Sequence, residues 1–208
     1  MSEFPETYLA HAAQAKLDVS QVSGAHFGGP GSVIVYDGPS RCYRAVLPGD
    51  QHTISEPEQV VVCGHGDIAQ ALAVGTAGAT IQEITGYLAR DIRDHLAAWA
   101  DTERLAHLAP ITATRRAMLR HGFRINRCSR LGRTDAGALM TTDVFVFRET
   151  PALTVTVAHT AAADETSTRM GLIDHATEVA VWNGITRTET ACARACQINA
   201  AAHRYLGH

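Results

Sequence analysis

The chain has 208 residues, of which 46% are apolar and 19% charged, and its formal net charge is −3. This length and apolar content indicate one large globular domain, or a domain with a small appendage, and exclude a chain too polar to build a core. The net acidity also argues against a protein whose whole surface binds nucleic acid, because such binding needs many cationic contacts to phosphates.

The sequence carries no sign of a membrane or secretory protein. No apolar run approaches 18 residues, and the first six residues are acidic and polar rather than basic and then apolar. The cysteines are odd in number and widely spread, which favours reduced thiols over a disulfide framework. We therefore expect a cytoplasmic protein without a membrane partner. The five cysteines are Cys42, Cys63, Cys128, Cys192 and Cys196.

The first third of the chain mixes helical and strand patterns. Apolar residues at helical spacing are followed by a loop rich in glycine and proline, and then by three short runs rich in β-branched residues. A turn at 37–40 joins the first two runs, which predicts a hairpin. A later apolar stretch has no periodicity that assigns it. The segments are a helix within 4–17, a loop at 24–31, strands at 32–36, 42–47 and 59–63, and the unassigned stretch 68–74.

The clearest helical pattern covers residues 81–99. Apolar residues recur there every three or four positions, and Thr80 with Glu83 forms a capping-box pattern at the start. The preceding loop, 75–80, holds Gly75 and Gly78 and leads into the helix N-terminus. Unpaired N–H groups and the helix dipole at such an end can hold a phosphate.

The second half of the chain predicts a mostly antiparallel sheet with packed helices. A strand at 105–109 precedes a short helix at 113–121, which ends at Gly122. Residues 141–148 and 152–159 alternate between apolar and polar side chains, as in a hairpin with one covered face. We therefore expect an α+β or mixed α/β fold, with a main domain at 1–160 and a C-terminal helical extension at 161–208.

Charge is distributed unevenly along the chain. No acidic residue lies between Glu103 and Asp135, whereas the remaining residues hold 10 basic and 21 acidic side chains. This contrast predicts a local anion site on an acidic protein. Three roles stay open for the cluster: ion pairs or an interface within the fold, a small phosphorylated ligand, or nucleic acid. Its eight arginines are Arg104, Arg115, Arg116, Arg120, Arg124, Arg127, Arg130 and Arg133.

The order of segments in residues 69–148 resembles part of the GNAT acetyltransferase superfamily. An apolar run, a glycine-containing turn into a long helix, a strand, a short helix closing in Gly122-Phe123 and two strands follow one another. About 47 residues separate Gly75 from Gly122, similar to the interval in that family between the cofactor loop and the Gly-Phe pair. Only the middle glycine of the family's cofactor loop is matched, by Gly78.

This resemblance implies an N-acyltransferase that uses acyl-CoA, a small phosphorylated ligand. Backbone groups of the loop would bind the pyrophosphate, and arginines of the short helix would meet the adenosine 3′-phosphate. Met118 stands where many members have a tyrosine, so the resemblance names no general acid. The implied cofactor-binding residues are Gly78, Ala79, Thr80, Ile81, Arg115, Arg116 and Arg120, and the candidates for the general base are His65, Glu83 and His107.

The string Cys63-Gly-His65-Gly-Asp67 supports two interpretations. A cysteine and a histidine two residues apart could bind a metal together or form a nucleophile with its base. Cys63 also closes an apolar run, where a buried cysteine acts as a small hydrophobic residue. No second Cys/His pair of zinc spacing occurs, so we predict no metal.

A different function is suggested by the C-terminal region. Residues 178–194 resemble a helix-turn-helix, with Gly184 in the turn and Arg187 and Arg194 near a recognition helix. The aromatic, β-branched stretch 178–182 fits a strand equally well. The alternatives to a phosphate-binding acyltransferase are therefore a DNA-binding regulator and an interaction protein without catalysis.

Overall fold

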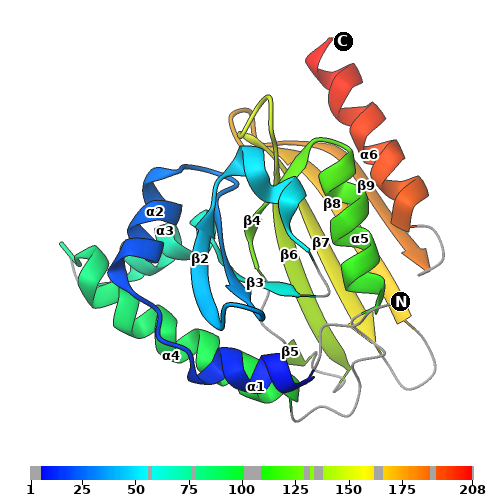
Figure 1. Ribbon diagram of the computed structural model, residues 1–208. Helices are drawn as coiled ribbons and strands as arrows, with labels where there is room; N and C mark the ends of the chain where they lie inside the picture. Colours follow the sequence, from blue (N-terminus) through cyan, green and yellow to red (C-terminus); the bar gives the residue numbers. More distant parts are fainter. Residues whose placement is uncertain are drawn as a thin grey trace. The chain divides into compact units, whose positions relative to one another are not determined.

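The computed structural model describes residues 6–55, 58–75, 78–100, 109–128, 132–133, 138–161, 166–187 and 191–207 (Figure 1). Helices combine with two largely antiparallel sheets, so the predicted α+β class is confirmed. The chain divides into two compact units, Met1–Leu105 with Asn126–Cys128 (unit 1) and Ala106–Ile125 with Ser129–His208 (unit 2). This division differs from the boundary near residue 160 that we expected from the sequence.

Unit 1 contains a three-stranded sheet in the order β2-β1-β3. The predicted hairpin is confirmed, since β1 (Val33–Asp37) pairs antiparallel with β2 (Cys42–Val46) from Val33 opposite Val46 to Asp37 opposite Cys42. On its other edge β1 pairs with β3 (Gln59–Gly64). Four consecutive residues of β1 are fully buried, which places this strand at the centre of the core.

Four α-helices accompany this sheet: α1 (Glu6–Gln14), α2 (Val19–Phe27), α3 (His65–Val74) and α4 (Ile81–Ala100); the 3₁₀ turn η1 (Pro48–Thr53) follows β2. The prediction for α4 is confirmed in extent and in its buried stripe. Ile84, Leu88, Ile92 and Leu96 are each at most 4% exposed. The unassigned stretch 68–74 belongs to α3.

The loop predicted at 24–31 is wrong over its first four residues, which are the end of α2. Gly24 lies inside this helix because the helix comes close to β2: a Cβ at Gly24 would lie 3.1 Å from that of Ala45. Val22 and Ala25 bury the same helix in the core. Close packing, rather than a turn, therefore explains the glycine.

Unit 2 is built around strands in the order β4-β6-β7-β8-β9, with the short β5 (Gly132–Arg133) paired to β6. The predicted hairpin is confirmed as the β6–β7 pair. The strands are β4 (Phe123–Arg127), of which residues 123–125 belong to this unit, β6 (Leu139–Phe147), β7 (Leu153–Ala161), β8 (Thr166–Asp174) and β9 (Val179–Arg187).

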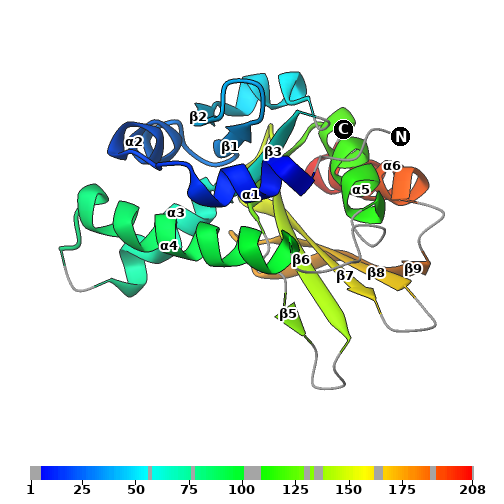
Figure 2. The same ribbon diagram turned by 60° about the horizontal axis from the view of Figure 1, so that its bottom comes forward.

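Two helices, α5 (Ala109–Arg120) and α6 (Ala191–Leu206), pack on each other over one face of this sheet (Figure 2). Phe145, Val155 and Leu172 stand opposite one another on β6, β7 and β8 and are fully buried. Met118 of α5 and Ile198 of α6 are also fully buried. The core of unit 2 is thus a row of apolar strand residues with helical side chains.

Three predictions for the second half need correction or restriction. The short helix begins at residue 109 rather than 113, so Ala109 is helical; the rest of the predicted strand at 105–109 lies outside the described residues. Residues 191–206 are helical as expected, but 166–187 form β8 and β9, so 161–208 is not a purely helical extension.

The helix-turn-helix interpretation of 178–194 is wrong. Residues 179–187 form β9 and pair antiparallel with β8, with Ile185 opposite Arg169 and Trp182 opposite Leu172. The aromatic and β-branched residues of this stretch favour a strand, as the alternative interpretation stated. Among the described helices, none combines the length and apolarity that crossing a membrane requires.

Candidate functional site

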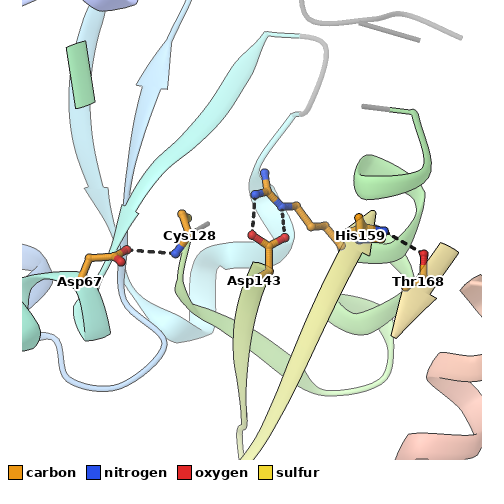
Figure 3. Close-up of polar contacts among 6 residues, drawn as sticks. Asp67, Cys128, Asp143, His159 and Thr168 are labelled. Atoms are coloured by element: carbon orange, nitrogen blue, oxygen red, sulfur yellow. Dashed lines mark hydrogen bonds and ion pairs between the residues drawn. The ribbon is translucent and has the colours of Figure 1, made fainter. Parts of the chain in front are cut away.

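The arginines of α5 have different environments. The guanidinium of Arg115 forms a two-point ion pair with Asp143 of β6, with Nε–Oδ2 at 2.6 Å and Nη2–Oδ1 at 2.8 Å (Figure 3). The Asp143 side chain is only 1% exposed and that of Arg115 12%. Arg116 and Arg120 are exposed, one turn apart. The charge of Arg115 therefore neutralises the buried carboxylate of Asp143 within unit 2, whereas Arg116 and Arg120 are on the exposed side of α5.

Three arginines belong to the segments that meet at the C-terminus of α5. We call Arg120, Arg124 and Arg148 the cationic corner. Arg120 ends the helix. The guanidinium of Arg124 donates through Nη1 to the carbonyl of Leu119, in the last turn of α5, at 3.1 Å and to that of Phe123, at the start of β4, at 2.8 Å. Arg148 follows β6 and donates its backbone N–H to Gly122 at 3.1 Å.

Positive charges in the cationic corner act on one another, as the pKa of Arg124 shows. Burial lowers the pKa of Arg124, and the nearby positive charge of Arg148 lowers it further. Arg124 is 6% exposed, while Arg120 and Arg148 are exposed. Among the described residues, neither Arg120 nor Arg148 has a carboxylate partner in an ion pair. The helix dipole offsets part of this charge, because its negative end lies at the same place.

The predicted phosphate loop, which belongs to unit 1, contains a hydrogen-bonded capping box. Thr80 donates its N–H to Oε2 of Glu83 at 2.7 Å, and Glu83 donates its N–H to Oγ1 of Thr80 at 3.3 Å. The hydrogen bonds that Thr80 donates to the Glu83 carboxylate, through its N–H and its hydroxyl, lower the pKa of Glu83. Two donors at the start of α4 are thus engaged, and a carboxylate already lies there. Gly78 has φ +92°, and Ala79 and Ile81 are partly exposed.

The string 63–67 has a structural explanation within unit 1. A Cβ at Gly64 would lie 2.2 Å from the carbonyl oxygen of Asn126, and one at Gly66 would lie 3.0 Å from it. Asp67 accepts hydrogen bonds from the N–H of Gly64 at 2.8 Å and of Cys128 at 3.0 Å, the latter drawn in Figure 3. The two glycines therefore leave room for the backbone of Asn126, and Asp67 binds the following residues of that segment through the N–H of Cys128.

The two candidate bases within the described residues, His65 and Glu83, have separate partners. His65 begins α3 and stacks on His26 with ring centroids 5.9 Å apart; burial first, and then His26, lowers its pKa. Glu83 is occupied in the capping box, and His107 lies outside the described residues. Cys63 is fully buried, which agrees with a structural thiol.

Two polar groupings in unit 2 were missed by the sequence analysis. Thr141, His159 and Thr168 form a buried row across three strands beside Asp143. On the helical side, Sγ of the exposed Cys196 lies 3.1 Å from Nε2 of His121, which joins α6 to the end of α5. Neither grouping has a short sequence motif.

Within the described ranges, no three His, Cys, Asp or Glu side chains gather as metal ligands would. Comparison of the chain with known protein families, with curated proteins and with solved structures found no match. The site must therefore be interpreted from its own chemistry.

Proposed function

We propose that this protein binds a phosphate-bearing small molecule and that the cationic corner of unit 2 contacts the phosphate. The observation that carries the proposal is that Arg120 ends α5, the guanidinium of Arg124 bonds to the carbonyl of Leu119 in the last turn, and Arg148 bonds through its backbone to Gly122 just after the helix. The positive charge of Arg148 also contributes to the lowered pKa of Arg124. Like charges held together near a low-dielectric interior cost free energy, and a bound anion would offset this cost. Arg120 adds a third charge from the last turn of α5.

Arginine suits a phosphate better than it suits a diffuse anionic partner. A guanidinium presents parallel N–H donors that match two phosphate oxygens, so three arginines around one helix end favour a compact, multiply charged group. Arg116 lies one turn before Arg120 in α5 and is also exposed. The ligand class is therefore a phosphate ester or a nucleotide-like cofactor.

The most specific form of this proposal is an N-acyltransferase that uses acyl-CoA. It is supported by the resemblance of residues 69–148 to the GNAT superfamily and by the phosphates that coenzyme A carries. Its reaction would transfer an acyl group from the thioester to an amine, with a base removing the amine proton.

A thermal-shift panel tests the ligand class. We expect acetyl-CoA, coenzyme A or ADP to raise the melting temperature, because a ligand that binds only the folded state stabilises it. Dephospho-CoA and pantetheine, which have fewer phosphates or none, should raise it less. Duplex DNA at physiological salt should not raise it. A shift with DNA alone would favour the DNA-binding alternative, and the absence of any shift would favour the interaction-protein alternative.

A further inference from the structure

A row of three polar side chains crosses the helix-covered face of the unit 2 sheet. Thr141 of β6 stands opposite His159 of β7, which stands opposite Thr168 of β8. Their side chains share one face because directly opposed residues of antiparallel strands point the same way. All three are buried, at 5%, 8% and 3% exposure, in a face whose neighbouring rows are largely apolar.

The hydrogen bonding of this row is incomplete. Nδ1 of His159 lies 2.9 Å from Oγ1 of Thr168, so that one ring nitrogen is bonded (Figure 3). Nε2 of His159 and Oγ1 of Thr141 have no hydrogen-bond partner among the described residues, although both atoms are closed off from solvent. A buried polar group without a hydrogen-bond partner destabilises the fold, and here two such groups are on adjacent strands.

The charges near the row are balanced. Asp143 follows Thr141 by two positions on the same face, and Arg115 pairs with both oxygens of its carboxylate. Burial lowers the pKa of His159 to about 4, Asp143 opposes this effect, and Arg115 adds to it. The imidazole is therefore neutral at pH 7, and no net charge is left to attract an ion.

We propose that Thr141 and His159 form a binding site for an uncharged small molecule, which they hold through its carboxamide or hydroxyl group. Such a group donates one hydrogen bond and accepts another, which suits two unbonded atoms on directly opposed residues that can each do either. The site is separate from the cationic corner. Seven residues along β6 separate Thr141 from Arg148, roughly 23 Å at about 3.3 Å per residue.

Acetamide and acetate are suitable probes because they have nearly the same shape and differ in charge. In protein labelled with ¹⁵N-histidine, acetamide should shift the Nε2 resonance of His159 in a saturable manner, and acetate should not. The isosteric change Thr141→Val should weaken acetamide binding at least tenfold, while Thr141→Ser, which keeps the hydroxyl, should retain it. Thr154→Val, on the opposite face of β7, is the matched control and should bind as the wild type does.

Three results would overturn the proposal. The first is an Nε2 resonance that acetamide does not shift. The second is equal acetamide affinity in the wild type and in Thr141→Val. The third is a long-lived water at His159, seen by its magnetisation transfer to the ring, that acetamide does not displace. None of these depends on phosphate binding, so failure here is distinguishable from failure at the cationic corner.

Discussion

His159 makes the stability of unit 2 depend on pH in a direction that the structure specifies. Burial lowers the pKa of His159 from 6.5 to about 4 in the folded protein. Between these two values the unfolded chain binds a proton that the folded chain does not. Stability is therefore fully present above pH 6.5 and falls as the pH drops toward 4.

The size of this effect follows from the two pKa values. A change from 6.5 to about 4 corresponds to about 3 kcal/mol once both states are protonated. Roughly 2.5 kcal/mol of it is lost by pH 4.5. This is a substantial part of the ~5–15 kcal/mol that stabilises a typical domain.

Urea unfolding at pH 7.5 and pH 4.5, compared between the wild type and His159→Gln, measures this contribution. Glutamine does not titrate, so the variant should lose about 2.5 kcal/mol less than the wild type over this range. His175→Gln, at an exposed position just after β8, should leave the pH dependence unchanged. The reasoning would be refuted by equal pH dependence in the wild type and His159→Gln, or by a ring titration of His159 near pH 6.5.

Two further predictions concern other contacts of unit 2. Asp143→Asn removes the negative charge that faces the buried guanidinium of Arg115, so the free energy of unfolding should fall by about 3–5 kcal/mol in urea titrations; a loss below about 1 kcal/mol would mean that the pair is not buried in solution. Iodoacetamide should alkylate Cys196 faster than Cys42, which is also exposed, because Nε2 of His121 lies within hydrogen-bond distance of the Cys196 sulfur and an imidazole there can act as a base during alkylation. Mass spectrometry should show this difference disappear in His121→Ala, and equal rates in the wild type would contradict the contact.

Much of the fold was predictable because periodicity depends on local burial. The stripe from Ile84 to Leu96 identified α4, and the alternation of Leu153, Val155 and Val157 identified a strand with one covered face. In contrast, α2 was mistaken in part for a loop, because Gly24 in the sequence suggests a turn. Its reason for being in a helix is the approach of Ala45, a contact between distant residues.

The candidate site was predictable only in part, for a similar reason. The excess of arginines was visible, but the assignment of Arg115 to an internal ion pair depends on Asp143, 28 residues away. Arg148 lies outside the acid-free stretch, and its backbone bond to Gly122 is a contact between segments 26 residues apart. One signal in the sequence could have indicated the polar groups of unit 2. Asp143 and His159 each occupy a position of the alternating pattern that is otherwise filled mostly by buried apolar residues. A polar side chain at such a position needs a hydrogen-bonding partner inside the fold.

The central claim, that the cationic corner binds phosphate, is tested most directly by calorimetric titration of coenzyme A into three proteins. They are the wild type, Arg120→Gln with Arg148→Gln, and a control with Arg90→Gln and Arg93→Gln, two exposed arginines of α4. Both variants lose two positive charges, so only position differs. We predict that the corner variant binds at least about tenfold more weakly than the wild type, since each charge-assisted hydrogen bond contributes about 1.5–3 kcal/mol, and that the control binds as the wild type does. No binding to the wild type, or an equal loss of affinity in both variants, would contradict the account.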